Sequence, residues 1–365
     1  MNKALYILSF CVFISMLFSC GDEDVMDPPE EEIMQDTTSY NLEYGGLPSP
    51  DLPVDNKLTE QGVELGRMLF YETMLSRDNS QSCASCHRQE HAFTDTARFS
   101  LGVEGLPGKR QAMSVFNMAW NSNEFFWDGR AHLLRDQAIL PIQDELEMDE
   151  TLENVIQKLS DSKTYRDQFI RAFGSDEVTV DKLAKALEQF MMSIVSYDSK
   201  FDRWKAGLVE LTESEERGMM LYNTEYNEFF PEFSGADCAH CHGGANFEND
   251  LYMNNGLDSE ADFTDLGREN VTMDIADRAK FKVPSLRNIE LTAPYMHDGR
   301  FNTLEEVIEH YDNGIHPSPT LDFALLATTN TGLRLTDQDK EDLINFLKTL
   351  TDQTLISDER YSNPF

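Results

Sequence analysis

The sequence predicts a mainly α-helical protein whose two halves repeat one another. Apolar residues recur at helical spacing, most clearly from Leu183 to Val195, and no stretch alternates apolar and polar residues over the length of a strand. In addition, a pattern near residue 60 returns near residue 212. We therefore expect two similar helical units and only minor sheet.

The repeat begins with Leu-Thr-Glu at residues 58–60 and 211–213, each followed by Gly-x-Met-Leu and an aromatic residue at 66–70 and 218–222. Thr59 and Thr212 are expected to cap helices, and Glu215 completes a capping box for the second. Asp-Gly-Arg then occurs at 128–130 and at 298–300. Residues 151–206 are expected to form two helices, and a last helix starts at residues 335–337.

The first residues resemble an export signal. Lys3 precedes an uninterrupted run of apolar and small residues, and the run ends at Ser19-Cys20, as in a bacterial lipobox. Residues 1–19 would then be a lipoprotein signal peptide and Cys20 the lipidated residue; a plain secretory signal is the alternative. Residues 20–50 are acidic and contain proline, which predicts a disordered tether. The protein is therefore expected to be exported and lipid-anchored at the cell envelope, on the periplasmic face or the cell surface.

The composition is strongly acidic. The 66 Asp and Glu residues outnumber the 30 Lys and Arg residues, for a formal net charge of −36. Binding to nucleic acid requires clustered positive charge, so this class of partner is excluded.

The four cysteines that follow Cys20 all lie in two C-x-x-C-H motifs, Cys83-Ala-Ser-Cys86-His87 and Cys238-Ala-His-Cys241-His242. Two thiols three residues apart on one helical turn can each form a thioether to a haem vinyl group, while the following imidazole reaches the iron. A single zinc site would need the pairs to be closer in sequence, and neither zinc nor disulfides explain the histidine after each pair. The motifs indicate a cytochrome with two covalent haem c groups.

The fold class follows: two cytochrome c-like haem domains packed face to face, an N-terminal one over residues 51–205 and a C-terminal one over 206–365. Aligning the halves on their Asp-Gly-Arg triplets places Pro141 opposite Tyr311. Proline cannot bind iron and tyrosine can, so the first haem would be open and the second closed. The alternative for Tyr311 is a buried core aromatic residue.

Several segments resemble the bacterial diheme cytochrome c peroxidase and MauG family. They are Phe126 to Arg130, then Gln137, Pro141 and Glu147-Met148, Pro284 to Asn288, and Ala293 to Arg300. The resemblance covers residues 58–350. It implies that the His87 haem is the peroxidatic centre and that the His242 haem passes electrons to it, with Trp127 between the two haems.

The resemblance also implies that Gln137, Pro141 and Glu147 line the distal pocket of the first haem. Chemistry agrees for Glu147: cleaving the O–O bond of a peroxide requires a proton to move from one oxygen to the other, and a carboxylate can move it. Gln137 would orient the peroxide by hydrogen bonding.

Two positions depart from the peroxidases that need reductive activation. Where those carry a removable distal histidine, this chain has Val103, so no ligand should have to leave the first haem. Where they carry a methionine ligand, this chain has Tyr311, as in the quinone-maturing branch of the family. Met296 and Met273 are alternative ligands to the second haem.

The family also binds one calcium ion between its domains. The matching residues are Gln111, Thr292 and Pro294, whose oxygens suit calcium. Gln111 replaces the usual asparagine with a longer side chain.

The first function hypothesis is an exported peroxidase that reduces hydrogen peroxide with electrons from a c-type cytochrome or similar periplasmic carrier. The acidic surface would attract a basic donor. The alternatives are oxidation of a protein or organic substrate, as by MauG, and electron transfer without catalysis. A homodimer is a further expectation.

Overall fold

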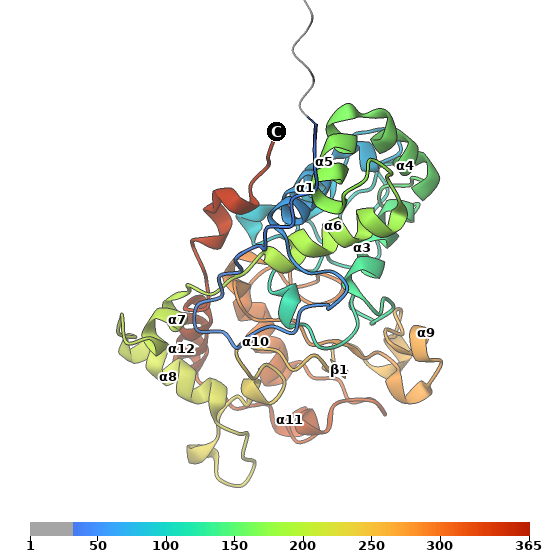
Figure 1. Cartoon of the computed structure of the whole chain (residues 1–365). Helices are drawn as coiled ribbons and strands as arrows, with labels where there is room; N and C mark the ends of the chain where they lie inside the picture. The colour runs from blue at the N-terminus through green and yellow to red at the C-terminus, as the bar shows by residue number, and fades with distance from the viewer. Residues whose placement is uncertain (1–31) are drawn as a thin grey trace, which may run out of the picture. The chain divides into compact units, whose positions relative to one another are not determined.

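The computed structural model describes residues 32–365, in which helices dominate and sheet is minimal (Figure 1). The helices before residue 206 are α1 (Glu60–Tyr71), α2 (Cys83–Cys86), α3 (Leu134–Gln143), α4 (Leu152–Asp161), α5 (Lys163–Phe173), α6 (Val180–Ser193) and α7 (Lys200–Lys205). The later helices are α8 (Glu213–Asn223), α9 (Glu269–Thr272), α10 (Leu304–Asn313), α11 (Thr328–Thr331) and α12 (Asp337–Lys348). Strands β1 (Tyr252–Met253) and β2 (Phe281–Lys282) pair antiparallel. The mainly α fold class is confirmed.

The expected signal peptide over 1–19, the lipidated Cys20 and the start of the tether lie outside the described residues. Within residues 32–365, no helix is both long and apolar enough to cross a bilayer.

The expectation of a disordered tether up to residue 50 is wrong for its described part. The backbone N–H of Tyr40 donates to Leu58 O at 3.1 Å, and that of Glu60 donates to Thr38 O at 2.9 Å. Tyr40 and Leu42 pack against the core, and the indole of Trp120 donates to Pro48 O at 2.7 Å. The prediction relied on the acidic composition of the segment as a whole. The burial of a few apolar side chains is nevertheless enough to hold the segment on the surface of the fold.

The repeat appears as two equivalent helix crossings. Helix α1 packs on α6, and α8 packs on α12. Both crossings use the glycine of the repeated motif: a Cβ on Gly66 would lie 2.0 Å from Ala186 O, and one on Gly218 would lie 1.9 Å from Asp342 O. The absence of side chains lets each helix pair touch backbone to backbone.

The predicted helix caps are confirmed. Thr59 accepts from Gly62 N at the start of α1, and Thr212 forms a capping box with Glu215 at α8. Thr336 forms the same box with Asp339 at α12. These polar side chains replace the hydrogen bonds that the first helical N–H groups lack.

Residues 151–206 form four helices rather than the two expected. Ser162 has extended backbone (ψ 118°) and separates α4 from α5. Ser199 caps the short α7 together with Asp202. The apolar periodicity correctly located α6, but an extended residue at Ser162 and a capping box at Ser199 divide the flanking segments.

In the described part of the chain, the hydrophobic core consists of two clusters. One gathers α1 and α3 to α6 around Phe70, Phe93 and Phe190, and the other gathers α8, α10 and α12 around Phe346. The end of the chain departs from the expected division at residue 206, because Leu355 and Tyr361 belong to the first cluster. Contacts group residues 34–365 as one compact unit. The face-to-face arrangement of two separate domains stays a prediction.

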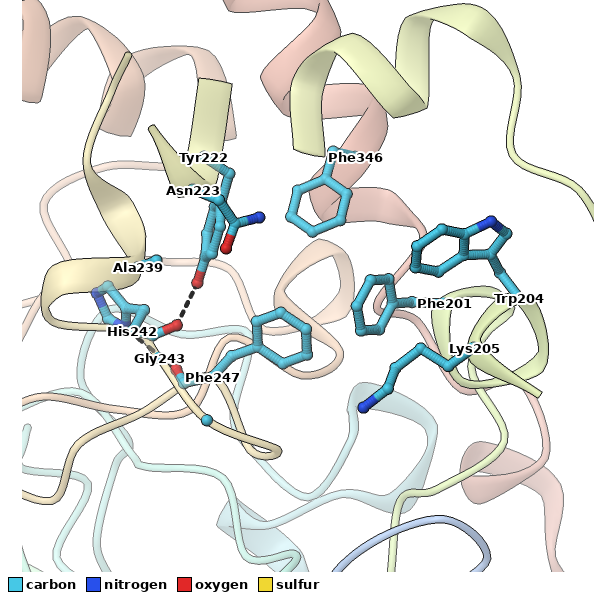
Figure 2. A pocket seen from close by; sticks show the side chains of 11 residues that line it. Phe201, Trp204, Lys205, Tyr222, Asn223, Ala239, His242, Gly243, Phe247 and Phe346 are labelled. Carbon is cyan, nitrogen blue, oxygen red and sulfur yellow. Dashed lines mark hydrogen bonds between the residues drawn. The ribbon is translucent and has the colours of Figure 1, made fainter. Parts of the chain in front are cut away.

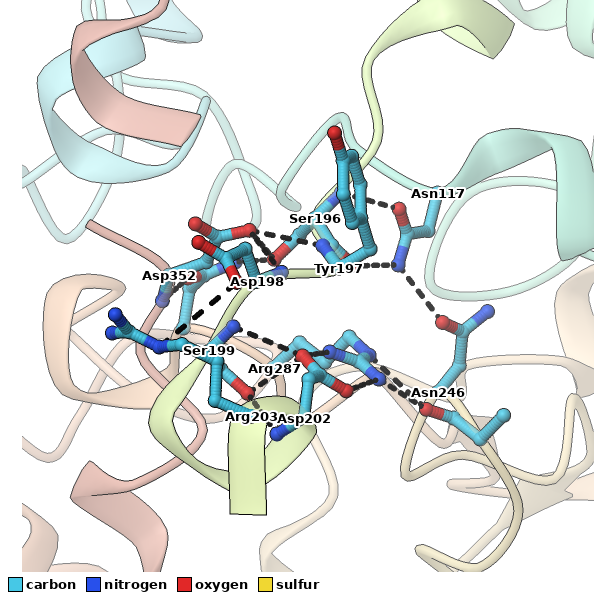
Figure 3. A network of polar contacts seen from close by, with 12 residues as sticks. Asn117, Ser196, Tyr197, Asp198, Ser199, Asp202, Arg203, Asn246, Arg287 and Asp352 are labelled. Carbon is cyan, nitrogen blue, oxygen red and sulfur yellow. Dashed lines mark hydrogen bonds and ion pairs between the residues drawn. The ribbon is translucent and has the colours of Figure 1, made fainter. Parts of the chain in front are cut away.

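A buried polar network ties distant segments together (Figure 3). Asn117 accepts from Ser196 N at 2.8 Å and donates to Asn246 at 2.9 Å. Asp352 accepts from the backbone of Tyr197 and Asp198 at 2.9 and 3.0 Å. The network fixes the linker between α6 and α7 against segments on either side of it in sequence.

Candidate haem sites

The first C-x-x-C-H motif lies on α2, where Ser82 and Ser85 cap each other. Cys83 and Cys86 are free thiols on one helical turn. The Nδ1 atom of His87 lies 3.0 Å from Phe93 O, which leaves Nε2 to bind a metal. Burial lowers the pKa of His87, so that the ring is neutral, as a metal ligand must be.

The second motif has the same design. Nδ1 of His242 lies 3.3 Å from Phe247 O and 3.1 Å from Pro284 O, and burial lowers the pKa of the ring to about 4. The two acceptors that occupy equivalent places in the repeat, Phe93 and Phe247, have left-handed backbone (φ 60° and 56°), which turns their carbonyl groups toward the histidines. Two large apolar residues thus hold a conformation that normally favours glycine.

A cavity of about 600 Å³ adjoins the second motif (Figure 2). The Tyr222 hydroxyl donates to His242 O at one side of it, and Phe247 and Phe346 form its inner wall. Phe201 and Trp204 of α7 close the opposite side, with ring centroids 5.5 Å apart. Aromatic side chains therefore line a cavity that reaches the backbone of the histidine that would hold the iron.

These residues fit covalent haem at both motifs. The four thiols are free, and no cluster of three or more metal-binding side chains occurs in residues 32–365. Each motif instead offers two neighbouring thiols and one imidazole whose second nitrogen is already bonded.

Glu147 lies beside the first motif. Its charge contributes to raising the pKa of both Cys83 and Cys86, although burial of the thiols is the larger cause for each. Its own pKa is raised to about 7 by burial and then by Asp144, with Arg130 acting in the opposite direction. A carboxyl group that titrates near neutral pH can both accept and donate a proton.

Val103 and Pro141 join Glu147. The N–H of Val103 donates to Glu147 O at 2.8 Å, so the loop carrying Val103 rests on the glutamate backbone. Pro141 lies inside α3, and its carbonyl accepts from Met148 N at 3.2 Å. Gln137, half-buried, lies one helical turn before Pro141 on the same face. The structure thus brings together the residues predicted for the distal pocket.

Trp127 is buried at a junction between the two halves of the sequence. Its indole N–H donates to Gln111 O at 2.8 Å, and its carbonyl accepts from Lys282 N at 2.7 Å. The N–H of Gln111 in turn donates to His297 O at 2.9 Å. His297 is the counterpart of Trp127 in the repeat, so the two equivalent loops meet through one residue.

The two Asp-Gly-Arg loops share their geometry. Phe125 N donates to Ala131 O and Tyr295 N to Phe301 O, both at 2.7 Å. Each loop also reaches the other half: Asp298 pairs with Arg98 at 3.1 Å, and Arg268 donates to Asp128 O at 3.3 Å.

The three residues predicted to bind calcium are not joined by any contact in the described chain. The Gln111 amide nitrogen donates to Thr94 Oγ1 at 2.9 Å and to Asp95 O at 3.4 Å. Thr292 donates to Ile289 O at 3.3 Å, and Pro294 follows a cis peptide bond. The calcium site stays a prediction.

Tyr311 and Met296 lie on either side of Asn255, and Tyr311 is close enough to the second motif for the charges of its cysteines to act on it. The Asn255 amide nitrogen is 3.3 Å from Tyr311 Oη and 3.4 Å from Met296 Sδ. Burial raises the pKa of Tyr311 to about 12, and the charges of Cys241 and Cys238 act in the same direction. Met273 is 83% exposed at the end of α9, so it is wrong as an alternative ligand.

Sequence reasoning missed two features near these sites. Asn255 is one, since an asparagine in a loop carries no periodic signal. The other is Lys282, only 5% exposed, whose Nζ lacks a hydrogen-bond partner and lies 3.4 Å from Asp250 Oδ1. The positions of Asn255 and Lys282 both depend on contacts between residues far apart in sequence.

Residues 60–210 match the family model described as di-haem cytochrome c peroxidase. The chain is 34% identical over 304 residues to methylamine utilization protein MauG of Methylophilus methylotrophus, covering 82% of this chain and 84% of that one. It is 39% identical over 249 residues to cytochrome c551 peroxidase of Nitrosomonas europaea, covering 68% and 71%.

A solved structure of a MauG-like protein associated with microbial copper homeostasis superposes with a TM-score of 0.80 at 34% identity, covering 89% of this chain and 99% of that one. The family implies two haem c groups, which the geometry of both motifs fits. The chain is an oxidoreductase that belongs to the di-haem cytochrome c peroxidase and MauG family.

Proposed function

We propose that this protein reduces hydrogen peroxide to water at the His87 haem, with electrons that arrive through the His242 haem from a c-type cytochrome or similar carrier. The observation that carries the proposal is the half-buried Glu147 carboxyl beside the first motif, next to Val103 and Pro141, neither of which has a side chain that can bind iron. The names of relatives such as cytochrome c551 peroxidase agree with this reaction.

The haem supplies the iron that binds peroxide and the electrons that reduce it. The protein supplies the proton movement: Glu147 accepts a proton from one peroxide oxygen and returns it to the other, which then leaves as water. The balance is one peroxide, two electrons and two protons to two waters. Gln137 donates a hydrogen bond that orients the peroxide, and Pro141 keeps the position open.

Trp127 supports electron movement between the two sites. Its ring is buried, and hydrogen bonds at its indole and carbonyl hold it between Gln111 and Lys282. A fixed aromatic side chain at this junction shortens the through-space gaps that an electron must cross.

A second function is favoured by Tyr311. The charges of Cys241 and Cys238 act on its hydroxyl group, which supports a role near the second motif, and a phenolate stabilises higher oxidation states of iron more than a thioether does. Oxidising equivalents could then be passed to a protein or organic substrate, as the similarity to MauG suggests. In this case reduced cytochrome would be a poor substrate.

The remaining proposals concern location and assembly. We propose export with a lipid anchor at Cys20 on the periplasmic face or cell surface, since the run before Cys20 has the pattern of a lipobox. A calcium ion held by Gln111, Thr292 and Pro294, and a homodimer, are further proposals that rest on the family resemblance alone.

Low-temperature electron paramagnetic resonance of the diferric holoprotein, never exposed to reductant, tests the open site. One high-spin and one low-spin haem are expected. Two low-spin haems would overturn the proposal that the His87 site needs no activation. Peroxide-dependent oxidation of reduced cytochrome c then separates the peroxidase from the second function.

A further inference from the structure

An exposed aromatic loop precedes the second haem motif. The loop spans residues 224–235, between α8 and Cys238, and protrudes below α8 in Figure 1. Its three phenylalanines are largely solvent-exposed: Phe229 at 81%, Phe230 at 56% and Phe233 at 71%. Burying such side chains is favourable, so their exposure in one short segment indicates a surface that another molecule covers.

The internal repeat provides a comparison. The equivalent segment of the first half lies between α1 and Cys83, and its sequence from Glu72 to Ser82 is mostly polar. Its one large buried side chain, Leu75, is fully inside the core, and Met74 packs against the same cluster. The exposed aromatics are therefore specific to the second motif and are not required by the fold that both halves share.

Hydrogen bonds within the loop define its backbone conformation. The Asn227 side-chain oxygen accepts from Phe229 N at 3.0 Å and from Phe230 N at 2.9 Å, and Ser234 Oγ accepts from Asn227 N at 2.9 Å. Gly235 closes the loop by donating to Glu225 O at 3.1 Å. These bonds fix the backbone while the aromatic rings point away from the core.

The loop is anchored at the haem motif and at the segment around α11. Asp237 N donates to Thr224 O at 3.0 Å, immediately before Cys238. The Tyr226 hydroxyl is hydrogen-bonded to Thr331 of α11. On the same segment Phe323, 72% exposed, packs edge-on against His240 inside the motif, with centroids 5.4 Å apart. Exposed aromatic side chains therefore lie at two places beside the second motif, on the loop and at Phe323.

Acidic residues predominate around these rings, because the three glutamates of the loop outnumber one cation, Arg334, whose guanidinium donates to Glu228 O at 3.3 Å. Glu225, Glu228 and Glu232 are exposed on the loop. An apolar centre with an acidic rim complements a protein that has a hydrophobic patch surrounded by lysines. The same rim repels anionic lipid headgroups, which argues against a membrane as the occupant.

We propose that the aromatic loop, with Phe323, is the docking surface for a small basic electron-transfer protein that exchanges electrons with the His242 haem. This inference rests on the proposed peroxidase function and names the surface and the charge of its partner. The phenylalanines supply the contact area, and the three glutamates steer the approach.

The test uses the full-length holoprotein and reduced basic cytochrome c, with a small dye donor in parallel. In the variant F229S/F230S/F233S, the KM for cytochrome should rise roughly tenfold, since each ring removed from an interface of this kind costs affinity. Peroxide-dependent oxidation of the dye should stay unchanged, because a small donor needs no docking surface. The matched control replaces three exposed apolar residues elsewhere, V54S/M273S/I275S, and should leave both activities unchanged.

A second variant distinguishes the electrostatic role of the glutamates from the contacts made by the phenylalanines. E225Q/E228Q/E232Q should weaken the dependence of cytochrome oxidation on ionic strength while leaving dye oxidation unchanged.

Three results would overturn the docking proposal while the dye is still oxidised: an unchanged KM in the phenylalanine variant, no oxidation of basic cytochrome by the wild type, or a wild-type dimer that this variant converts to a monomer. The last would show that a second copy covers the loop. If the wild type oxidises neither the dye nor cytochrome with peroxide, the proposed peroxidase function itself fails.

Discussion

The phenol oxygen of Tyr311 lies 3.3 Å from the side-chain nitrogen of Asn255, and the same nitrogen lies 3.4 Å from Met296 Sδ. One amide therefore lies within reach of both remaining candidates for the sixth ligand of the second haem. In the repeat, Met296 is the counterpart of Phe126, which has no ligating atom. Tyr311 corresponds to Pro141, the open position of the first half.

Replacing Tyr311 by methionine is expected to raise the reduction potential of the His242 haem, because a thioether stabilises the reduced iron better than an anionic oxygen does. A spectroelectrochemical titration measures it. Met296→Leu should leave that potential unchanged. If Met296→Leu shifts the potential and Tyr311→Met does not, the methionine is the ligand and the argument from Tyr311 fails.

Glu147 predicts the pH dependence of peroxide turnover. Its pKa is raised to about 7, chiefly by burial, so the group is protonated below that pH and carries a negative charge above it. The charged form is the one that accepts the peroxide proton, so turnover should rise as pH increases through about 7. Glu147→Gln should lower turnover by roughly 10²- to 10⁴-fold and remove this limb of the profile.

The matched control is Glu145→Gln, an exposed neighbour two residues earlier, which should keep the wild-type profile. Steady-state rates from pH 5 to 9 provide the measurement. A Glu147→Gln enzyme with wild-type turnover would show that another group moves the proton.

Local patterns predicted much of this protein. The repeated Leu-Thr-Glu triplets located the starts of α1 and α8, and two C-x-x-C-H motifs located both sites. The left-handed backbone of Phe93 and Phe247 could not be predicted, because phenylalanine rarely adopts it and only surrounding contacts hold it there. The position of Asn255 and the return of Tyr361 to the first cluster likewise depend on packing between residues far apart in sequence.

At the repeated glycines, replacement by alanine is expected to destabilise the protein, the opposite of its usual effect in a helix. In most helices alanine is more stable than glycine by about 1 kcal/mol. At Gly66 and Gly218 the added Cβ would lie about 2 Å from a backbone oxygen of the crossing helix, which cannot move alone. Each alanine variant should therefore lose about 1–3 kcal/mol in free energy of unfolding, measured with denaturant.

Gly46→Ala is the control for these two variants, since a Cβ added at Gly46 would have no heavy atom within 4 Å of it beyond its chain neighbours. It should change stability little. Alanine at Gly66 or Gly218 that stabilises the protein would mean that the helices can separate without loss of packing.

Arg287 tests how strongly the buried network holds α7. It is 2% exposed, forms two hydrogen bonds to Asp202 at 2.7 and 2.9 Å, and donates to Ala245 O (Figure 3). Removing one partner of a buried pair leaves the other charge without compensation, so Arg287→Ala should cost about 3–5 kcal/mol of unfolding free energy.

Two comparisons make this prediction specific. Arg203 on the same helix as Asp202 is exposed and lies 3.9 Å from Asp198, so Arg203→Ala should cost less than about 1 kcal/mol. The double variant Arg287→Ala with Asp202→Asn should cost less than the sum of the two single changes, because the second removes the charge that the first leaves unpaired. Additive losses in this double-mutant cycle would show that the two side chains stabilise the fold independently, through Ala245 and the α7 cap, rather than through each other.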